Sequence, residues 1–184
     1  MVPITALWMP IAVSAVLVFA ASSLAHMVLP YHRGDYDKLP DEDGLLEALR
    51  AQKAGAGNYV APHCVTPEER SSREVKAKLA RGPLAFVTVI PSLAIGKQLV
   101  SWFVYCLVVG VFVAYLTGRT AAPGTDYLAV FRLAGTTAFL AYAGGTASES
   151  IWMGRKWSTT AKNVLDSLAY ALLTAGAFGW LWPS

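Results

Sequence analysis

Two carboxylates and one ammonium group interrupt the last two long apolar runs of this sequence. Glu149 lies near the end of one run, and Lys162 and Asp166 lie near the start of the next. Lys162 and Asp166 are four residues apart, a spacing that places both side chains on one face of a helix. An ionised side chain inside a bilayer costs roughly 3 kcal/mol or more unless it finds a partner. We therefore expect Glu149, Lys162 and Asp166 to form a neutralised polar cluster that locks a helical hairpin.

The functional alternative for these three residues is a proton or ion path, or a contact with a lipid headgroup or a cofactor. A proton relay across a membrane requires further acids at greater depth. The remaining charge within the apolar runs is Arg132, which lies near the start of its run, towards the predicted outer face of the membrane. This gap weakens a transport mechanism and favours the structural role.

The histidines and cysteines offer a second kind of chemistry. His26 lies at the end of the first apolar run, where a single histidine can ligate a chlorophyll-type magnesium or a haem iron. Haem with two histidine ligands needs a second intramembrane histidine, but His32 and His63 fall in the polar segment that follows. His63 and Cys64 lack the paired spacing of a structural metal site. The sequence predicts no metal site and two free thiols, at Cys64 and Cys106.

The sequence also lacks the motifs of common enzymes. It contains no GxGxxG, no phosphate-binding P-loop and no GxSxG turn. Its net charge of +3 is too small to indicate nucleic-acid binding. We therefore predict no catalytic residues and no resident cofactor. A chlorophyll-type pigment or haem at His26, or a lipid contact, is the alternative.

The composition is that of a membrane protein. Hydrophobic residues make up 55% of the chain, mean hydropathy is +0.44, and charged residues make up only 15%, against about 25% in soluble domains. Four apolar runs, at about 2–29, 99–116, 127–152 and 158–182, are each suited to crossing a hydrocarbon core about 30 Å thick. No Lys or Arg precedes the first run, so we interpret it as a transmembrane helix rather than a signal peptide.

A polar insert is predicted between the first two membrane helices, which divides the chain into residues 1–29, 30–96 and 97–184. A helix follows the capping acids Asp41 and Asp43 in "LPDEDGLLEALRAQ". A second helix lies in "TPEERSSREVKAKLARG", where the spacing of Thr, Pro and Glu predicts a capping box and the final Gly a stop. The run "LAFVTVI" is either strand-like or interfacial. The predicted fold is an all-α membrane protein with four transmembrane helices and a mixed, mainly helical cytoplasmic insert.

Small residues mark faces suited to close helix packing. Ala171, Ala175 and Gly179 recur every four residues in the last run, as do Gly144 and Ser148 in the run before it. Stripes of this kind let helix backbones approach closely in a membrane. They fit either packing within the chain or docking onto a larger complex.

The distribution of cations predicts the orientation. The insert, residues 30–96, together with Lys97 holds ten of the fifteen Lys and Arg residues. The turn between helices three and four carries Arg155 and Lys156, whereas the turn between helices two and three carries Arg119 alone. Cytoplasmic loops are enriched in Lys and Arg. We therefore expect a multi-pass protein of a bacterial plasma membrane, with residues 30–96 cytoplasmic and both termini periplasmic.

Several segments resemble a family of short bacterial polytopic membrane proteins with no assigned function. They are "HMVLPYHRGDYDKLPDED", "GPLAFVTVIPS", "SWFVYCLVVGVFVAY" and "NVLDSLAYALLTAGAFGWLWP", which together extend over most of the chain. The resemblance implies a bacterial plasma membrane and carries no activity or site residues with it.

These features favour a non-enzymatic accessory or structural subunit of a larger bacterial membrane complex, of respiratory or photosynthetic type. Its predicted partners are the lipid bilayer and other integral membrane subunits, with no nucleic acid. The alternative function is a small proton- or ion-linked carrier that uses Glu149 and Asp166. A second alternative is an enzyme or metal protein that uses His26, His32, His63 and Cys64.

The orientation is testable with an impermeant thiol reagent. In a chain whose Cys64 and Cys106 are replaced by serine, Arg73→Cys should resist labelling in intact cells and become labelled after permeabilisation, because it lies in the predicted cytoplasmic insert. Thr125→Cys, in the predicted periplasmic turn, serves as the control and should be labelled in intact cells. Labelling of Arg73→Cys in intact cells would show that the predicted orientation is wrong.

Overall fold

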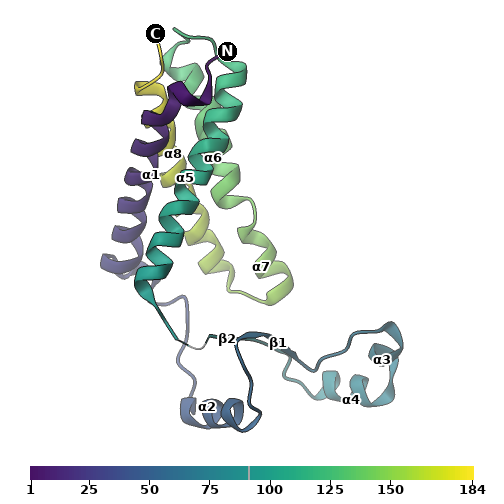
Figure 1. Cartoon of the computed structure of the whole chain (residues 1–184). Coiled ribbons are helices and arrows are strands. Elements are labelled where there is room, and N and C mark those ends of the chain that lie inside the picture. The colour runs from purple at the N-terminus through teal and green to yellow at the C-terminus, as the bar shows by residue number, and fades with distance from the viewer. Residues whose placement is uncertain (91) are drawn as a thin grey trace. The chain divides into compact units, whose positions relative to one another are not determined.

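The computed structural model describes residues 1–90 and 92–184 and is mostly helical (Figure 1). Pro91, which belongs to the predicted insert, lies outside the described residues. Three helical segments are long and apolar enough to cross a membrane: Ile4–Val28, Ile95–Thr120 and Tyr127–Met153. The prediction of a mainly helical fold is therefore confirmed, and three of the helical segments have the length and composition that a membrane crossing requires.

The chain divides into two compact units, which we call the helical unit and the insert unit. The helical unit comprises Met1–Asp37 and Ile95–Ser184, and the insert unit comprises Lys38–Ala94. The sequence-based boundary after residue 29 differs from this division, because residues 30–37 belong to the helical unit. They do so because polar side chains in this stretch bond to the last helix.

The first candidate span is not one uniform helix. A 3-10 turn, Ile4–Leu7, leads into α1, Trp8–Ser23, and a π-helical turn, Leu24–Val28, ends it. A second 3-10 turn, Pro30–His32, follows directly. The chain therefore changes its helical pitch at the end of the apolar run, where the polar residues begin.

The third candidate span is made of two helices. Helix α6, Tyr127–Ala143, begins at Asp126, whose side chain accepts a hydrogen bond from the backbone N–H of Leu128. Helix α7, Thr146–Met153, continues after Gly144 and Gly145. Two successive glycines weaken a helix because they gain the most conformational freedom on unwinding. The sequence-based prediction of one continuous run did not include this break.

Helix α8, Trp157–Trp180, has 24 residues and at 1.5 Å per residue is about 36 Å long. That length suits a membrane crossing, but Lys162, Asn163 and Asp166 in its first half lower its mean hydropathy. It is not among the three candidate spans. The fourth span therefore stays a prediction.

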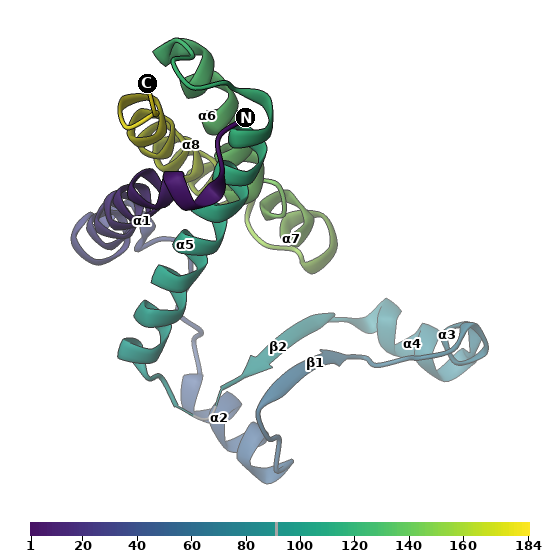
Figure 2. The ribbon, with the colours of Figure 1, turned by 45° about the horizontal axis from the view of Figure 1, so that its top comes forward.

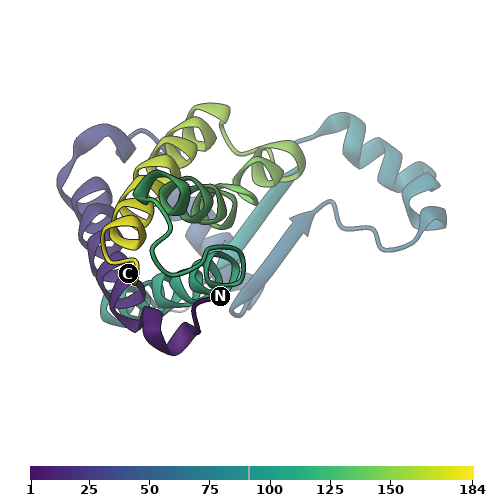
Figure 3. The same cartoon turned by 90° about the horizontal axis from the view of Figure 1, so that it is seen from above.

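The helical unit is a bundle in which α6 packs most extensively on α8, α1 contacts α5 and α8, and α5, Ile95–Thr120, contacts α6. Figure 3 views these helices along the bundle, with α1 in purple, α5 in teal, α6 in green and α8 in yellow. Fully buried side chains in the bundle include Leu7, Val18, Val113, Val130 and Phe178. The indole Nε1 of Trp102 donates to Ser22 Oγ at 2.7 Å, which connects α5 to the C-terminal end of α1.

Small residues form the α6–α8 contact. Ala171 and Ala175 on α8 are buried. A Cβ added to Gly135 on α6 would lie 3.1 Å from the Cβ of Ala175, so the two backbones approach closely there. Of the two roles left open for the stripe on α8, these two residues serve packing within the chain.

The insert unit consists of α2, β1, α3, α4 and β2 in chain order, with the following bounds: Glu42–Ala51, Gly57–Ala61, Pro67–Ser71, Arg73–Arg81 and Ala85–Val89. The two strands pair antiparallel, with Tyr59 opposite Val87, and α3 and α4 lie in the connection between them (Figure 2). Asp41 caps α2, and Thr66 and Glu69 form the predicted capping box of α3. Residues 85–89 form a strand, one of the two alternatives for that apolar run.

Close packing of α6 on α8 predicts that a large side chain at Gly135 is not tolerated. Gly135→Leu should lower stability by about 1–3 kcal/mol, the usual cost of overpacking. Gly96→Leu on α5 is the matched control, because a Cβ there meets nothing within 4 Å. Thermal unfolding of both variants in the same detergent measures the difference. Equal midpoints would show that the α6–α8 contact does not require the glycine.

Candidate functional site

Six polar side chains meet where the first candidate span ends and α8 begins. We call them the histidine–carboxylate cluster: His26, Tyr31, His32, Asp35, Lys162 and Asp166. All six belong to the helical unit. The π-helical turn supplies one residue, the 3-10 turn and the residues after it supply three, and α8 supplies the other two.

His32 lies between two carboxylates. Its Nδ1 is 2.6 Å from Asp35 Oδ2, and its Nε2 is 2.8 Å from Asp166 Oδ2. An ionised carboxylate only accepts hydrogen bonds, so both ring nitrogens are placed as donors, as in an imidazolium ion. With His32 in that form and Lys162 as the second cation, the two carboxylates are balanced in charge. The His32 side chain is only 9% exposed, which makes this balance important.

Asp35 is held by α8. Lys162 Nζ donates to Asp35 Oδ1 at 2.7 Å, and Thr159 Oγ1 lies 3.4 Å from the same oxygen. Burial disfavours the charged form of Asp35, but the hydrogen bonds from Lys162 and His32 outweigh burial and lower its pKa to about 2. Asp35 is therefore ionised at neutral pH and fixes one side of His32.

Asp166 accepts hydrogen bonds on both of its oxygens. His32 donates to Oδ2, and the hydroxyl of Tyr31 donates to Oδ1. Burial and then the bond to Asp166 raise the pKa of Tyr31 to about 12, so this hydroxyl remains a donor. Donors from a neighbouring segment thus satisfy a carboxylate that is mostly enclosed by protein.

His26 completes the cluster on its open side. Its ring stacks on that of His32, with 4.1 Å between centroids, and its Nε2 lies 3.8 Å from Asp166 Oδ2. The side chain is 48% exposed. It projects from a π-helical turn, a rare geometry that occurs frequently at functional sites.

The three residues predicted to form one polar cluster are divided between two sites. Lys162 pairs with Asp35, and Asp166 pairs with His32 and Tyr31. Glu149 on α7 accepts instead from Arg155 in the following turn. The expected Glu149–Lys162 contact is thus replaced, because the chain after α1 supplies closer partners for α8 than the neighbouring helix does.

Tyr31 and Asp35 were not predicted as site residues, and His32 entered only the alternative of an enzyme or metal protein, because residues 30–37 were assigned to the insert. The predicted orientation gave one signal for these residues, because it places the end of the first helix and the start of the fourth at the same membrane face. The sequence did not show which helices are neighbours, since that depends on tertiary packing.

The remaining sequence-based candidates lie apart from this cluster. His63 and Cys64 belong to the insert unit, where His63 borders a shallow depression beside Tyr59 and Phe86. Cys64 and Cys106 are both free thiols, and Cys106 is buried. The stacked rings of His26 and His32 do not face one another across a gap, as two axial haem ligands must.

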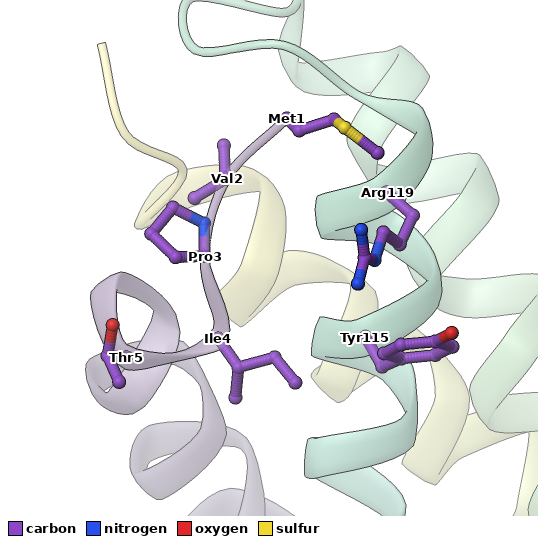
Figure 4. A pocket seen from close by; sticks show the side chains of 7 residues that line it. All are labelled: Met1, Val2, Pro3, Ile4, Thr5, Tyr115 and Arg119. Carbon is purple, nitrogen blue, oxygen red and sulfur yellow. The ribbon is translucent and has the colours of Figure 1, made fainter.

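A second recess, of about 420 Å³, lies between residues 1–5 and the end of α5 (Figure 4). Arg119 lies over the ring of Tyr115, 5.6 Å from its centroid, within cation–π distance. The other lining side chains are mostly apolar. Tyr and Arg at the end of an apolar helix are typical anchors at a membrane interface, so we assign this recess no chemistry.

Comparison of the chain with protein-family models, with curated proteins and with solved structures found no match. The resemblance to a bacterial membrane family therefore stays a prediction, and the functional interpretation depends on the sequence and the geometry of this chain.

The different surroundings of Asp166 and Glu149 predict different costs for the same amide substitution. Asp166→Asn should lower stability by about 1–3 kcal/mol, because it leaves Tyr31 and His32 without a charged acceptor. Glu149→Gln should cost less than about 1 kcal/mol, because its pair with Arg155 is exposed. Thermal unfolding in detergent measures both variants against the parent chain. Equal losses would contradict the separation of the two sites.

Proposed function

We propose that this chain is a non-enzymatic accessory or structural subunit of a larger complex in a bacterial plasma membrane. Its partners are other integral membrane subunits, which it contacts through the insert unit. In this proposal four helices cross the bilayer, both termini are periplasmic and the insert is cytoplasmic. The concentration of Lys and Arg in and beside the insert supports that orientation.

The observation that carries the proposal is the absence of a core in the insert unit. None of its described residues, 38–90 and 92–94, is buried. A two-stranded hairpin is marginally stable on its own, and a unit of this size ordinarily needs a buried core, a metal or a partner. We infer that another protein surface completes its packing.

The exposed apolar residues of the insert unit provide a surface for that partner. Tyr59, which is 44% exposed, lies opposite the half-buried Val87 on one face of the hairpin. On the other face Phe86, which is 48% exposed, lies opposite Val60, and Thr88 Oγ1 donates to Asn58 Oδ1 at 3.0 Å. Both faces therefore expose apolar side chains, and Asn58 and Thr88 interrupt them on the face with Phe86.

Helix α2 adds to the exposed apolar area. Leu45 and Leu46 are 40% and 45% exposed, although their spacing predicts an apolar stripe that faces a core. An apolar helix face that is left exposed in this way is typical of a site of protein or membrane interaction. We infer a protein partner rather than a membrane surface, because the insert also carries interleaved acids and bases suited to polar contacts around an apolar centre.

The carrier alternative has less support. Within the described residues, Glu149 and Asp166 have separate partners, and both pairs are neutralised locally. A path that uses the two carboxylates in sequence would require groups that connect them.

Substitution on the two faces of β2 tests the proposal. Gentle-detergent purification from native membranes should recover the chain with other integral membrane proteins at fixed stoichiometry. Val87→Lys should remove these companions, because it replaces an apolar side chain opposite Tyr59 with a charge. Thr88→Lys, the same change at the adjacent residue, should retain them, because Thr88 is already polar and exposed. Mass spectrometry and light scattering measure composition and size.

Two outcomes would contradict the accessory-subunit proposal. One is a monodisperse parent chain that purifies without companions. The other is a Val87→Lys variant that retains every companion at the parental stoichiometry.

A further inference from the structure

We propose that the histidine–carboxylate cluster binds one zinc-like divalent metal ion through His26 Nε2, His32 Nε2 and Asp166. This inference goes beyond the proposed function, since an accessory subunit needs no metal. One possible ligand atom from each of the three residues lies within 4.8 Å of the other two. Two imidazoles and one carboxylate are a donor set that suits zinc and its borderline neighbours.

The distances between ligand atoms are close to those of a tetrahedral site. Ligand bonds of about 2.0–2.1 Å at tetrahedral angles separate donor atoms by about 3.4 Å. In the structure Asp166 Oδ2 is 2.8 Å from His32 Nε2 and 3.8 Å from His26 Nε2. The widest separation in the set is at most 4.8 Å, so movements of about 1.4 Å or less reach the required spacing. His26 is half exposed and can turn its ring to provide them.

The structure already contains side chains that hydrogen-bond to the proposed metal ligands and orient them. A metal-bound histidine usually donates its other ring N–H to a carboxylate, which sets its tautomer and orientation. His32 Nδ1 makes this bond to Asp35, which Lys162 holds in turn. Tyr31 bonds the second oxygen of Asp166. An arrangement that served only to join α8 to the preceding segment would not require His26, which makes no short bond in the cluster.

The metal takes the place of the proton that His32 Nε2 shares with Asp166. Solvent reaches the exposed side of His26 and supplies the fourth ligand. Because two of the three protein ligands are nitrogens, Mg²⁺ and Ca²⁺, which prefer oxygen, should bind far more weakly. The site is therefore selective for transition-type divalent ions.

Zinc binding to the full-length chain tests this inference. The protein is purified in mild detergent with a histidine-free tag, stripped with a chelator and dialysed against a series of Zn²⁺ concentrations in excess Mg²⁺. We expect one Zn²⁺ per chain and a rise in the thermal midpoint on binding. His26→Gln should weaken binding at least ten-fold. Its fold should persist, because the side chain is half exposed and makes no bond shorter than 3.8 Å within the cluster.

His63→Gln is the matched control, because it makes the same change in the insert unit. It should bind Zn²⁺ as the parent chain does and show the same midpoint shift. The inference is overturned if the parent chain binds no Zn²⁺, if His26→Gln retains parental affinity, or if His63→Gln loses affinity to the same extent. None of these results bears on the companions recovered in the Val87→Lys experiment, so the two proposals fail independently.

Discussion

A charged side chain within a low-dielectric helical bundle requires hydrogen-bond or ion-pair partners close by. In the helical unit Asp166 has such a side chain, which is only 10% exposed. Tyr31 and His32, which lie outside α8, supply the donors that it needs. The chain after α1 is thus held against α8, and the insert unit begins only at Lys38. The geometry at the end of the first span follows from one carboxylate that cannot remain unpaired.

The helical unit and the insert unit differ in how far their side chains are buried. In the helical unit, apolar residues are buried between α1, α5, α6 and α8, and the charges of the cluster balance one another. In the insert unit, helix caps and strand pairs are formed, yet none of the described residues is buried. Local structure without a core is typical of a segment whose packing is completed elsewhere. This contrast is the basis of the proposal that the insert unit packs against a partner.

The histidine–carboxylate cluster combines a structural role with a chemical one. His32 between two carboxylates joins two segments, and Lys162 extends the network to Asp35. His26 contributes little to that joining, since it is half exposed and 3.8 Å from Asp166. Its position on a π-helical turn next to a carboxylate and a second imidazole suits ligation instead. The same residues can therefore hold the bundle together and offer a metal a partly formed set of ligands.

The sequence by itself determined what depends on neighbours along the chain. Runs of apolar residues predicted the membrane-crossing helices, and the spacing of Thr66 and Glu69 predicted a capping box, because both features arise within a few turns of helix. The tertiary structure decided the partners of the charged residues. Lys162 and Asp35 are 127 positions apart, and Tyr31 and Asp166 are 135 apart. No local spacing encodes such pairs, since they depend on which helices pack together and on the π-helical turn that redirects the chain after α1.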